Sequence, residues 1–431
     1  MRFLSIATVF AALSGFLVII IATKTLDAET AKSFQAYWGL FFACTGILDG
    51  IMQETTRTVS MQRETTQKVP AHPDHGGVDK QDKQKPTLAH WHFGLLVGLT
   101  VAALSLLTES WWMPRILTDY QMAGSGLLAL GLCLYAFQAV LSGVLSGWEQ
   151  WPQYAWLIAL DSGIRFLLAA LAFLFGWDLL PFLLLTVVGT LSWAIIVLSN
   201  RGAREHLRTP LPVSLRTFAR RAGSAMLATG ASAAIISGIA PLISATLEEP
   251  EARAGVALSG IMIAVSFTRA PILVPLQRFQ SALIVYFVRH RERMRQAVLA
   301  PAAAVLGVGA FGAVLAWLIG PWLLRVGWDN DPAYAVPGPL LAALTFASAC
   351  TGVLMITGAA SIAAERHRLY VLGWVGASVT VGAILWWGTD PLTTVPAALI
   401  IGPLVGTVIH LSALRAPRGT EATQRAGQHR R

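Results

Sequence analysis

The sequence has very few charged residues for its length. Asp, Glu, Lys and Arg make up 13% of the 431 residues, whereas 55% of the residues are hydrophobic. A soluble globular domain carries about 25% charged residues. Low charge therefore excludes an ordinary water-soluble protein and predicts a chain embedded in a bilayer, which a run of about 20 apolar residues can span.

Cysteine is also scarce, and the motifs of several enzyme classes are missing. Cys44, Cys133 and Cys350 lie inside apolar runs with no CxxC spacing, so neither a disulfide framework nor a thiolate metal site is expected. The sequence contains no GxxxxGK[ST] and no HExxH. We therefore expect no cofactor, no bound metal and no enzymatic activity, although a separate partner ATPase stays open.

The segments between the apolar runs are short on one side of the predicted membrane. The longest is 321–337, which is too small to hold a sugar chain for an extracytoplasmic glycosyltransferase or polymerase. Asp27 and Glu29 could imitate the acidic motif of a polyprenyl-sugar glycosyltransferase, but they have little chain around them. We regard that interpretation as the weaker one.

Apolar runs of membrane-spanning length follow one another along almost the whole chain. The first of them is longer than the apolar region of a signal peptide, so we expect an uncleaved helix. The sequence predicts an all-α polytopic membrane protein with about 12 transmembrane helices. The predicted spans are 4–23, 34–56, 93–110, 121–147, 153–175, 179–199, 223–246, 255–287, 297–320, 338–361, 368–388 and 392–414.

Most Lys and Arg residues fall in alternate connecting segments. They gather in 57–85, 201–221, 289–295 and 415–431. Cytoplasmic loops carry such an excess of positive charge. We therefore expect both termini in the cytoplasm, a location in the cytoplasmic membrane, and no nucleic-acid partner despite the net charge of +9.

A basic segment divides the chain near its middle. We predict a six-helix bundle at 1–200 with a flexible polar cytoplasmic loop at 58–91, a basic linker at 201–222, a second six-helix bundle at 223–415, and a basic tail at 416–431. This 6+6 arrangement is typical of secondary transporters.

Two polar stretches outside the spans allow more than one interpretation. The stretch SLRTFARR, residues 214–221, could form a basic amphipathic helix on the inner membrane surface, or its arginines could only set topology. A metal site in the polar loop is disfavoured because nothing fixes its geometry. Its candidate ligands are His72, Asp74, His75, His90 and His92.

Charges occur inside the second span, in GILDGIMQETTR (46–57). At helical spacing, Asp49, Gln53 and Arg57 share a stripe with Gly46 and Gly50. Glu54 and Arg57 are three residues apart and can pair. The residues could line a polar cavity or supply a coupling group, or they could form an interfacial cluster that anchors the helix end.

The eighth span carries Arg269 near its middle, followed by Pro271 and Pro275. A charge at the bilayer centre costs at least about 2.5–3.5 kcal/mol, so it normally faces a bundle interior or water. Each proline removes a backbone donor. We favour a functional Arg beside a hinge over a structural Arg that binds carbonyls freed by the prolines.

Two further spans contain titratable side chains. Asp161 and Arg165 are four residues apart with the acid first, which suits pairing, and we favour a structural pair over a polar-cavity role. A single His410 near the end of the last span is more often structural than a proton relay. The pairs Gly94/Gly98, Gly143/Gly147 and Gly402/Gly406 have the GxxxG spacing of close helix contacts.

The first sixty residues resemble a known family. The small-residue first helix, the aromatic start FQAYWGLFF and the ending GILDGIMQETTR are similar to the first two helices of polysaccharide flippases. These belong to the multidrug/oligosaccharidyl-lipid/polysaccharide exporter superfamily. The second half opens similarly, with a basic lead into TFARRAGSAMLATGASAAIISGIAPLI. The long polar loop after the second span and the acid Asp49 depart from the pattern.

The resemblance implies two six-helix bundles around a central cavity lined by the first, second, seventh and eighth spans. The implied cargo is a polyprenyl-diphosphate-linked saccharide for the cell envelope, so envelope glycosyltransferases are possible partners. The cationic positions that match are Arg57, Arg269 and Arg278, whose planar forks suit phosphate. The alternatives are a drug or cation antiporter coupled through Asp49 or Asp161, and a non-transporting scaffold of an envelope-synthesis complex.

Overall fold

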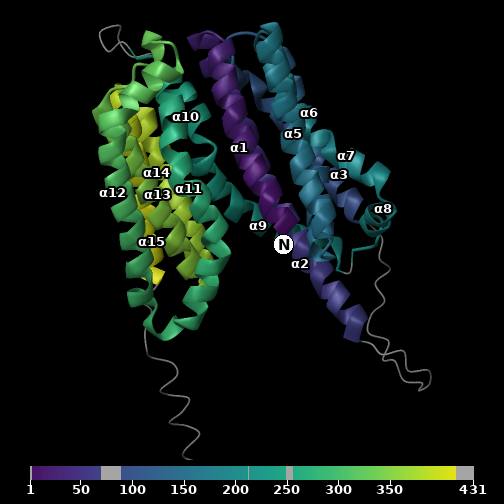
Figure 1. The fold of residues 1–431 in the computed structure, drawn as a ribbon. Helices are drawn as coiled ribbons and strands as arrows, with labels where there is room; N and C mark the ends of the chain where they lie inside the picture. The colour runs from purple at the N-terminus through teal and green to yellow at the C-terminus, as the bar shows by residue number, and fades with distance from the viewer. Residues whose placement is uncertain (1, 69–88, 212, 249–255, 414–431) are drawn as a thin grey trace, which may run out of the picture. The chain divides into compact units, whose positions relative to one another are not determined.

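The computed structural model describes residues 2–68, 89–211, 213–248 and 256–413. Helices account for nearly all of this part of the chain, and its one β-type contact is an isolated bridge between Ala89 and Pro210. The α-helices are α1 (Arg2–Thr25), α2 (Ala28–Lys68), α3 (His90–Trp112), α4 (Gln121–Gly147), α5 (Trp151–Phe175), α6 (Leu179–Val188), α7 (Ser192–Ser199), α8 (Arg201–Leu207), α9 (Leu215–Ile236), α10 (Ile239–Thr246), α11 (Leu258–Arg289), α12 (Met294–Gly327), α13 (Gly338–Ala363), α14 (His367–Trp387) and α15 (Pro391–Ala413) (Figure 1).

The all-α polytopic class is confirmed. Among the described residues, 10 helices are long and apolar enough to cross a membrane, and the bent pair α9 and α10 makes up to 11. The predicted span 34–56 lies in α2, which falls outside that set because Asp49, Gln53 and a polar end interrupt its apolar run. The prediction of about 12 spans thus corresponds to these helices together with α2.

The predicted flexible loop at 58–91 is wrong at its start. α2 continues as a helix to Lys68, because TVSMQRETTQK contains no Gly or Pro. An ion pair of 2.9 Å between Arg63 and Glu149 ties this extension to the corner that joins α4 and α5. Residues 69–88, which include His72, Asp74 and His75, lie outside the described residues.

The other two histidines of that segment have structural contacts at the start of α3. The His90 ring Nδ1 lies 2.9 Å from the carbonyl oxygen of Thr209. The His92 Nδ1 accepts a hydrogen bond of 3.1 Å from the backbone N–H of Ala89, which caps the helix. Both rings therefore anchor the beginning of α3.

The chain forms two compact units. The first comprises residues 1–248 and 257–262, with α4 packed on α2 and α3, α1 packed on α5, and α9 packed along α2. Packing places α9 and α10 in this unit, although α9 begins inside the linker predicted at 201–222 and α10 follows that linker. SLRTFARR forms the start of α9 and its cap at Ser214, and Phe218 is buried against Phe93. The domain boundaries predicted from the sequence stay a prediction.

Glycines allow the close helix contacts of the first unit, as the GxxxG spacing predicts. A Cβ at Gly143 would lie 2.5 Å from Thr55 of α2, and one at Gly147 would lie 2.7 Å from Val59. A Cβ at Gly98 would lie 2.9 Å from the carbonyl oxygen of Cys133. Backbones therefore approach within a distance that no larger residue tolerates.

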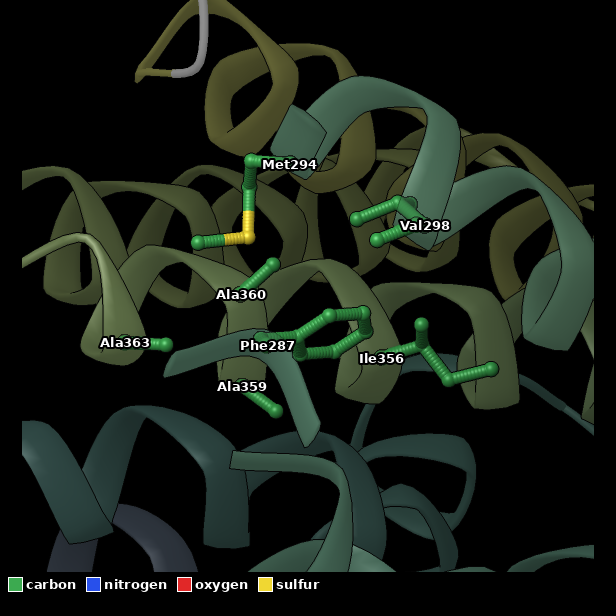
Figure 2. Packing of buried hydrophobic residues seen from close by; sticks show 8 residues of the cluster. Phe287, Met294, Val298, Ile356, Ala359, Ala360 and Ala363 are labelled. Carbon is green, nitrogen blue, oxygen red and sulfur yellow. The ribbon is translucent and has the colours of Figure 1, made fainter. Parts of the chain in front are cut away.

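The second unit comprises residues 249–256 and 263–431, and its described helices centre on α13. α13 packs against α12, α14 and α15, and most of its side chains are buried. Figure 2 shows Phe287 from α11 inserted against the small side chains of α13 and against α12. The cluster consists of Phe287, Met294, Ala297, Val298, Ile356, Ala359, Ala360 and Ala363.

Candidate functional site

The first unit holds a cluster of half-buried polar side chains where α2, α4 and α5 meet. Tyr135 of α4 donates a hydrogen bond of 2.7 Å from its hydroxyl to Oδ1 of Asp49 on α2. Tyr135 also interacts electrostatically with Asp161 and Tyr154 of α5. The structure thus brings Asp49 into contact with this phenol and places Asp161, more than a hundred residues away in the sequence, within electrostatic range of it.

Asp161 and Arg165 form the ion pair that their spacing predicts. Arg165 Nη1 donates to Oδ2 of Asp161, and Arg165 Nε donates a hydrogen bond of 3.0 Å to the carbonyl oxygen of Thr186. The guanidinium carbon also lies 5.1 Å from the ring centroid of Phe42 and 5.6 Å from that of Phe41. A buried guanidinium is stable here because a carboxylate, a carbonyl and two π faces surround it.

A break between α6 and α7 makes room for the Arg165 side chain. The helix tightens to a 3₁₀ turn at Gly189–Leu191. A Cβ at Gly189 would lie 2.7 Å from Arg165 Nε and 2.6 Å from the carbonyl oxygen of Asp161. Glycine is therefore required at this position for the guanidinium to reach Thr186.

Two atoms of the Asp161–Arg165 pair have no hydrogen-bond partner among the described residues. These are Oδ1 of Asp161 and Nη2 of Arg165, one acceptor and one donor. Water or a small polar ligand is the usual partner of such buried atoms. Since this pair is formally neutral and the described residues place no cation in hydrogen-bond contact with Asp49, Asp49 is the acid of the cluster that suits binding of a proton or a small cation.

One further residue of GILDGIMQETTR reaches this cluster, because the Tyr154 hydroxyl donates to the sulfur of Met52 at 3.6 Å. The charged pair and the glycines of the segment have other partners. Glu54 is buried and accepts hydrogen bonds from Arg57 at 2.8 Å from Nε and 2.6 Å from Nη2, which confirms the predicted pair. Arg57 itself is exposed, as is Gln53. Gly46 and Gly50 face α9, where a Cβ at either position would collide with Ala233 or Met226. The predicted stripe is thus in part a helix-packing face.

Arg269 lies in the second unit, buried within α11 at 7% exposure. α11 remains a helix through Pro271 and Pro275, and both prolines are exposed. Their role as a hinge stays a prediction. The side chain of Arg278 lies outside the described residues.

A sharp break occurs in the span that precedes α11. α9 and α10 meet at an angle of 64° at Ser237 and Gly238, where a Cβ on Gly238 would lie 2.6 Å from the carbonyl oxygen of Ala234. The dipeptide SG, followed by Pro241, is the signal that sequence reasoning overlooked. It also overlooked Tyr135, which lies with Gln138 in a run that is otherwise mostly apolar.

Known proteins resemble this chain over nearly its whole length, although no family model matches it. The uncharacterized proteins Rv3630 and Rv1510 of Mycobacterium tuberculosis (strain ATCC 25618 / H37Rv) are each 36% identical to it over 408 residues. The match covers 95% of this chain and 90% of each relative. The chain belongs to the family of these mycobacterial proteins.

Solved structures extend the likeness to a wider fold. An inward-facing multidrug resistance MATE family transporter of the MOP superfamily has a TM-score of 0.71 at 13% identity, covering 94% of each chain. The lipid II flippase MurJ in its inward closed conformation has a TM-score of 0.67 at 12% identity, covering 96% of this chain and 88% of that one.

A third likeness is to a MOP superfamily transporter from Pyrococcus furiosus described as having a binding pocket of reversed polarity. Its TM-score is 0.63 at 15% identity, covering 96% of this chain and 94% of that one. Together these similarities show that the chain has the two-bundle fold of MOP superfamily transporters. The resemblance found in the sequence is confirmed at the level of this fold.

Proposed function

We propose that this protein is a transporter that turns a polyprenyl-diphosphate-linked saccharide from the inner to the outer leaflet of the cytoplasmic membrane. Its two bundles would alternate access to the cargo, and both termini would lie in the cytoplasm. The likeness to the lipid II flippase MurJ over 96% of the chain supports a flippase. The two-unit architecture supports alternating access.

The observation that carries the choice of cargo is a buried cation in a membrane-length helix. Arg269 sits in the span Leu258–Leu276, where an ionised guanidinium has a large desolvation cost. Such residues in membranes normally serve substrate or ion pathways. The planar guanidinium binds phosphate oxygens in pairs, so a diphosphate is the ligand that suits it.

The other two candidate arginines contribute differently. The Arg57 guanidinium already donates two hydrogen bonds to Glu54, so less of it is available for an anion. A role for Arg278 in diphosphate binding is proposed only from its position on α11, nine residues after Arg269. We assign the main diphosphate contact to Arg269 because it is buried within a membrane-length helix, and we expect Arg57, which is exposed, to act as a secondary contact.

Depletion of the protein in its native host tests this function. Lipid extracts are analysed by mass spectrometry for polyprenyl-diphosphate-linked saccharides, and an impermeant probe reports the leaflet. Accumulation in the inner leaflet is the expected result and identifies the sugar. An unchanged lipid pool would refute the flippase. Envelope glycosyltransferases that make or use such a lipid are the proposed partners.

Substitution of Arg269 tests the role of the cation. Arg269→Ala should lower turnover by at least about tenfold at equal protein level, because a hydrogen bond to a charged group contributes about 1.5–3 kcal/mol. Arg269→Lys should retain part of the activity. Arg220→Ala, which removes an exposed arginine of α9, is the matched control. Full turnover in Arg269→Ala would refute the assignment of the diphosphate contact to Arg269.

A second candidate is a drug or cation antiporter coupled to protons or sodium. The hydrogen bond between Asp49 and Tyr135 favours it, because among the described residues the partner of this acid is a neutral phenol and not a cation. Asp161 is a weaker coupling group since Arg165 already pairs with it. This function predicts that depletion of the protein makes the host sensitive to cationic drugs. It also predicts that the Asp49→Asn variant, expressed in the depleted host, does not restore resistance.

A third candidate is a non-transporting scaffold of an envelope-synthesis complex. It predicts that both Arg269→Ala and Asp49→Asn complement the depleted host. Complementation by both variants would therefore separate a scaffold from either transporter.

A further inference from the structure

A histidine is completely buried in the second unit, and the proposed transport site does not use it. His410 of α15 is 0% exposed and lies between α13 and α14. Its Nδ1 is 3.1 Å from Oγ1 of Thr357 on α13. Its Nε2 is 3.0 Å from the backbone carbonyl oxygen of Tyr370 on α14. One imidazole thus connects three helices.

Two glycines form the slot that holds this ring. A Cβ at Gly373 of α14 would overlap the His410 ring, and one at Gly358 of α13 would lie 3.3 Å from its Cε1. The Tyr370 ring is nearly parallel to the imidazole, with centroids 6.0 Å apart. The slot fits the imidazole closely, and its polar partners meet both ring nitrogens.

The hydrogen-bond partners restrict the protonation states of the ring. A carbonyl only accepts, so Nε2 must carry a proton to bond Tyr370. The Thr357 hydroxyl lies 3.0 Å from the carbonyl oxygen of Val353, to which it can donate. When the Thr357 hydroxyl donates to Val353, the Thr357 oxygen can only accept a hydrogen bond from the ring. Nδ1 must then carry a proton as well, and His410 is an imidazolium.

A neutral His410 requires the other arrangement. Nδ1 is then an acceptor, and the Thr357 hydroxyl must turn from the Val353 carbonyl toward the ring. The two states differ by one proton on the ring and one rotation of a hydroxyl group. Both leave every ring nitrogen hydrogen-bonded, so the site accommodates either state with the same backbone.

Few other titratable groups occur on the helices around the ring. α15 has none besides His410, and α13 has Cys350 alone. α14 contributes Tyr370, which faces the ring, together with His367 and Arg368, which are exposed at its start. No carboxylate of these three helices offsets the charge of an imidazolium, so its stabilisation depends on the acceptors around the ring, which are the carbonyl oxygens of Tyr370 and Leu354 and the hydroxyl of Thr357.

We propose that His410 is a proton-binding site of the second unit, with the Thr357 hydroxyl as the group that changes partner when the proton binds. The proposal does not depend on the cargo, and it places this site in a different unit from Asp49 and Asp161. A proton bound between α13, α14 and α15 puts a charge into an apolar helix junction. Proton binding there can therefore alter how these helices pack.

Nitrogen NMR of the full-length protein in lipid nanodiscs tests the proposal. Protein labelled with ¹⁵N-histidine is titrated from about pH 8 to about pH 5, the interval in which imidazole changes charge. The His410 signals are those that disappear in His410→Gln. They can also be identified as those that move in Thr357→Val, should the first variant not fold. The expected result is one protonated and one bare nitrogen at high pH, and two protonated nitrogens at low pH.

Variants of Thr357 separate a built proton site from a merely buried ring. Thr357→Val removes one acceptor of the Nδ1 proton and leaves the carbonyl oxygen of Leu354 beside the ring, so the titration midpoint should fall by up to about one pH unit, given that such a hydrogen bond contributes about 1.5–3 kcal/mol. Thr357→Ser should keep the midpoint. A ring that stays in one neutral state throughout, or a midpoint unchanged in Thr357→Val, would overturn the proposal.

Discussion

Replacing Arg165 by Met should destabilise the first unit strongly, because the substitution leaves a carboxylate unpaired. Arg165 is 3% exposed and binds Asp161, the carbonyl oxygen of Thr186, and the faces of two phenylalanine rings. Methionine fills much of the same space without a charge. The loss is therefore electrostatic more than steric.

The burial of the Asp161–Arg165 pair indicates how much stability Arg165→Met should lose. Removing one partner of a buried ion pair costs about 3–5 kcal/mol, since the remaining charge keeps its desolvation penalty. The double variant Asp161→Asn with Arg165→Met removes both charges. Replacing a buried pair by neutral groups is often neutral or stabilising, so the double variant should recover most of the loss.

The measurement is the free energy of unfolding in mixed micelles, followed by tryptophan fluorescence. Arg63→Ala is the control, because Arg63 pairs with Glu149 through side chains that are 26% and 57% exposed. Exposed pairs contribute about 0–1 kcal/mol. A cost below about 1 kcal/mol for Arg165→Met, or a double variant no more stable than the single one, would refute the reasoning.

Two further predictions concern packing and pH. Gly50→Ala should separate α2 from α9 and destabilise the first unit, because the new Cβ would overlap the backbone of Met226. In the control variant Gly223→Ala the new Cβ meets no atom, so this variant should stabilise α9 by up to about 1 kcal/mol. The free energy of unfolding is measured for both variants, and equal effects would contradict the packing argument. Asp27 caps α2, and the hydroxyl of Thr30 lowers the pKa of Asp27 below 3.8. The capping contribution is therefore complete above that value and disappears as the pH falls through the lowered pKa. Thr30→Val should reduce stability at neutral pH, and the difference should shrink in acid; a difference that stays constant with pH would argue against the linkage.

The membrane class and most helix bounds follow from local sequence. Apolar runs correspond to α4, at Gln121–Gly147, and to the span Leu179–Ser199 within a residue or two. The Asp161–Arg165 and Glu54–Arg57 pairs were also predictable, since residues three or four apart share one helix face. GxxxG spacing indicated the close contacts of Gly143 and Gly147.

Tertiary structure decided which side chains meet across helices. No local signal connects Asp49 with Tyr135, or His410 with Thr357 and Tyr370, because those contacts depend on which helices are neighbours. The sequence by itself determined that the chain consists of membrane-length helices, since apolar length is a one-dimensional property. Packing determined which polar side chains meet across helices and which buried atoms lack a hydrogen-bond partner among the described residues.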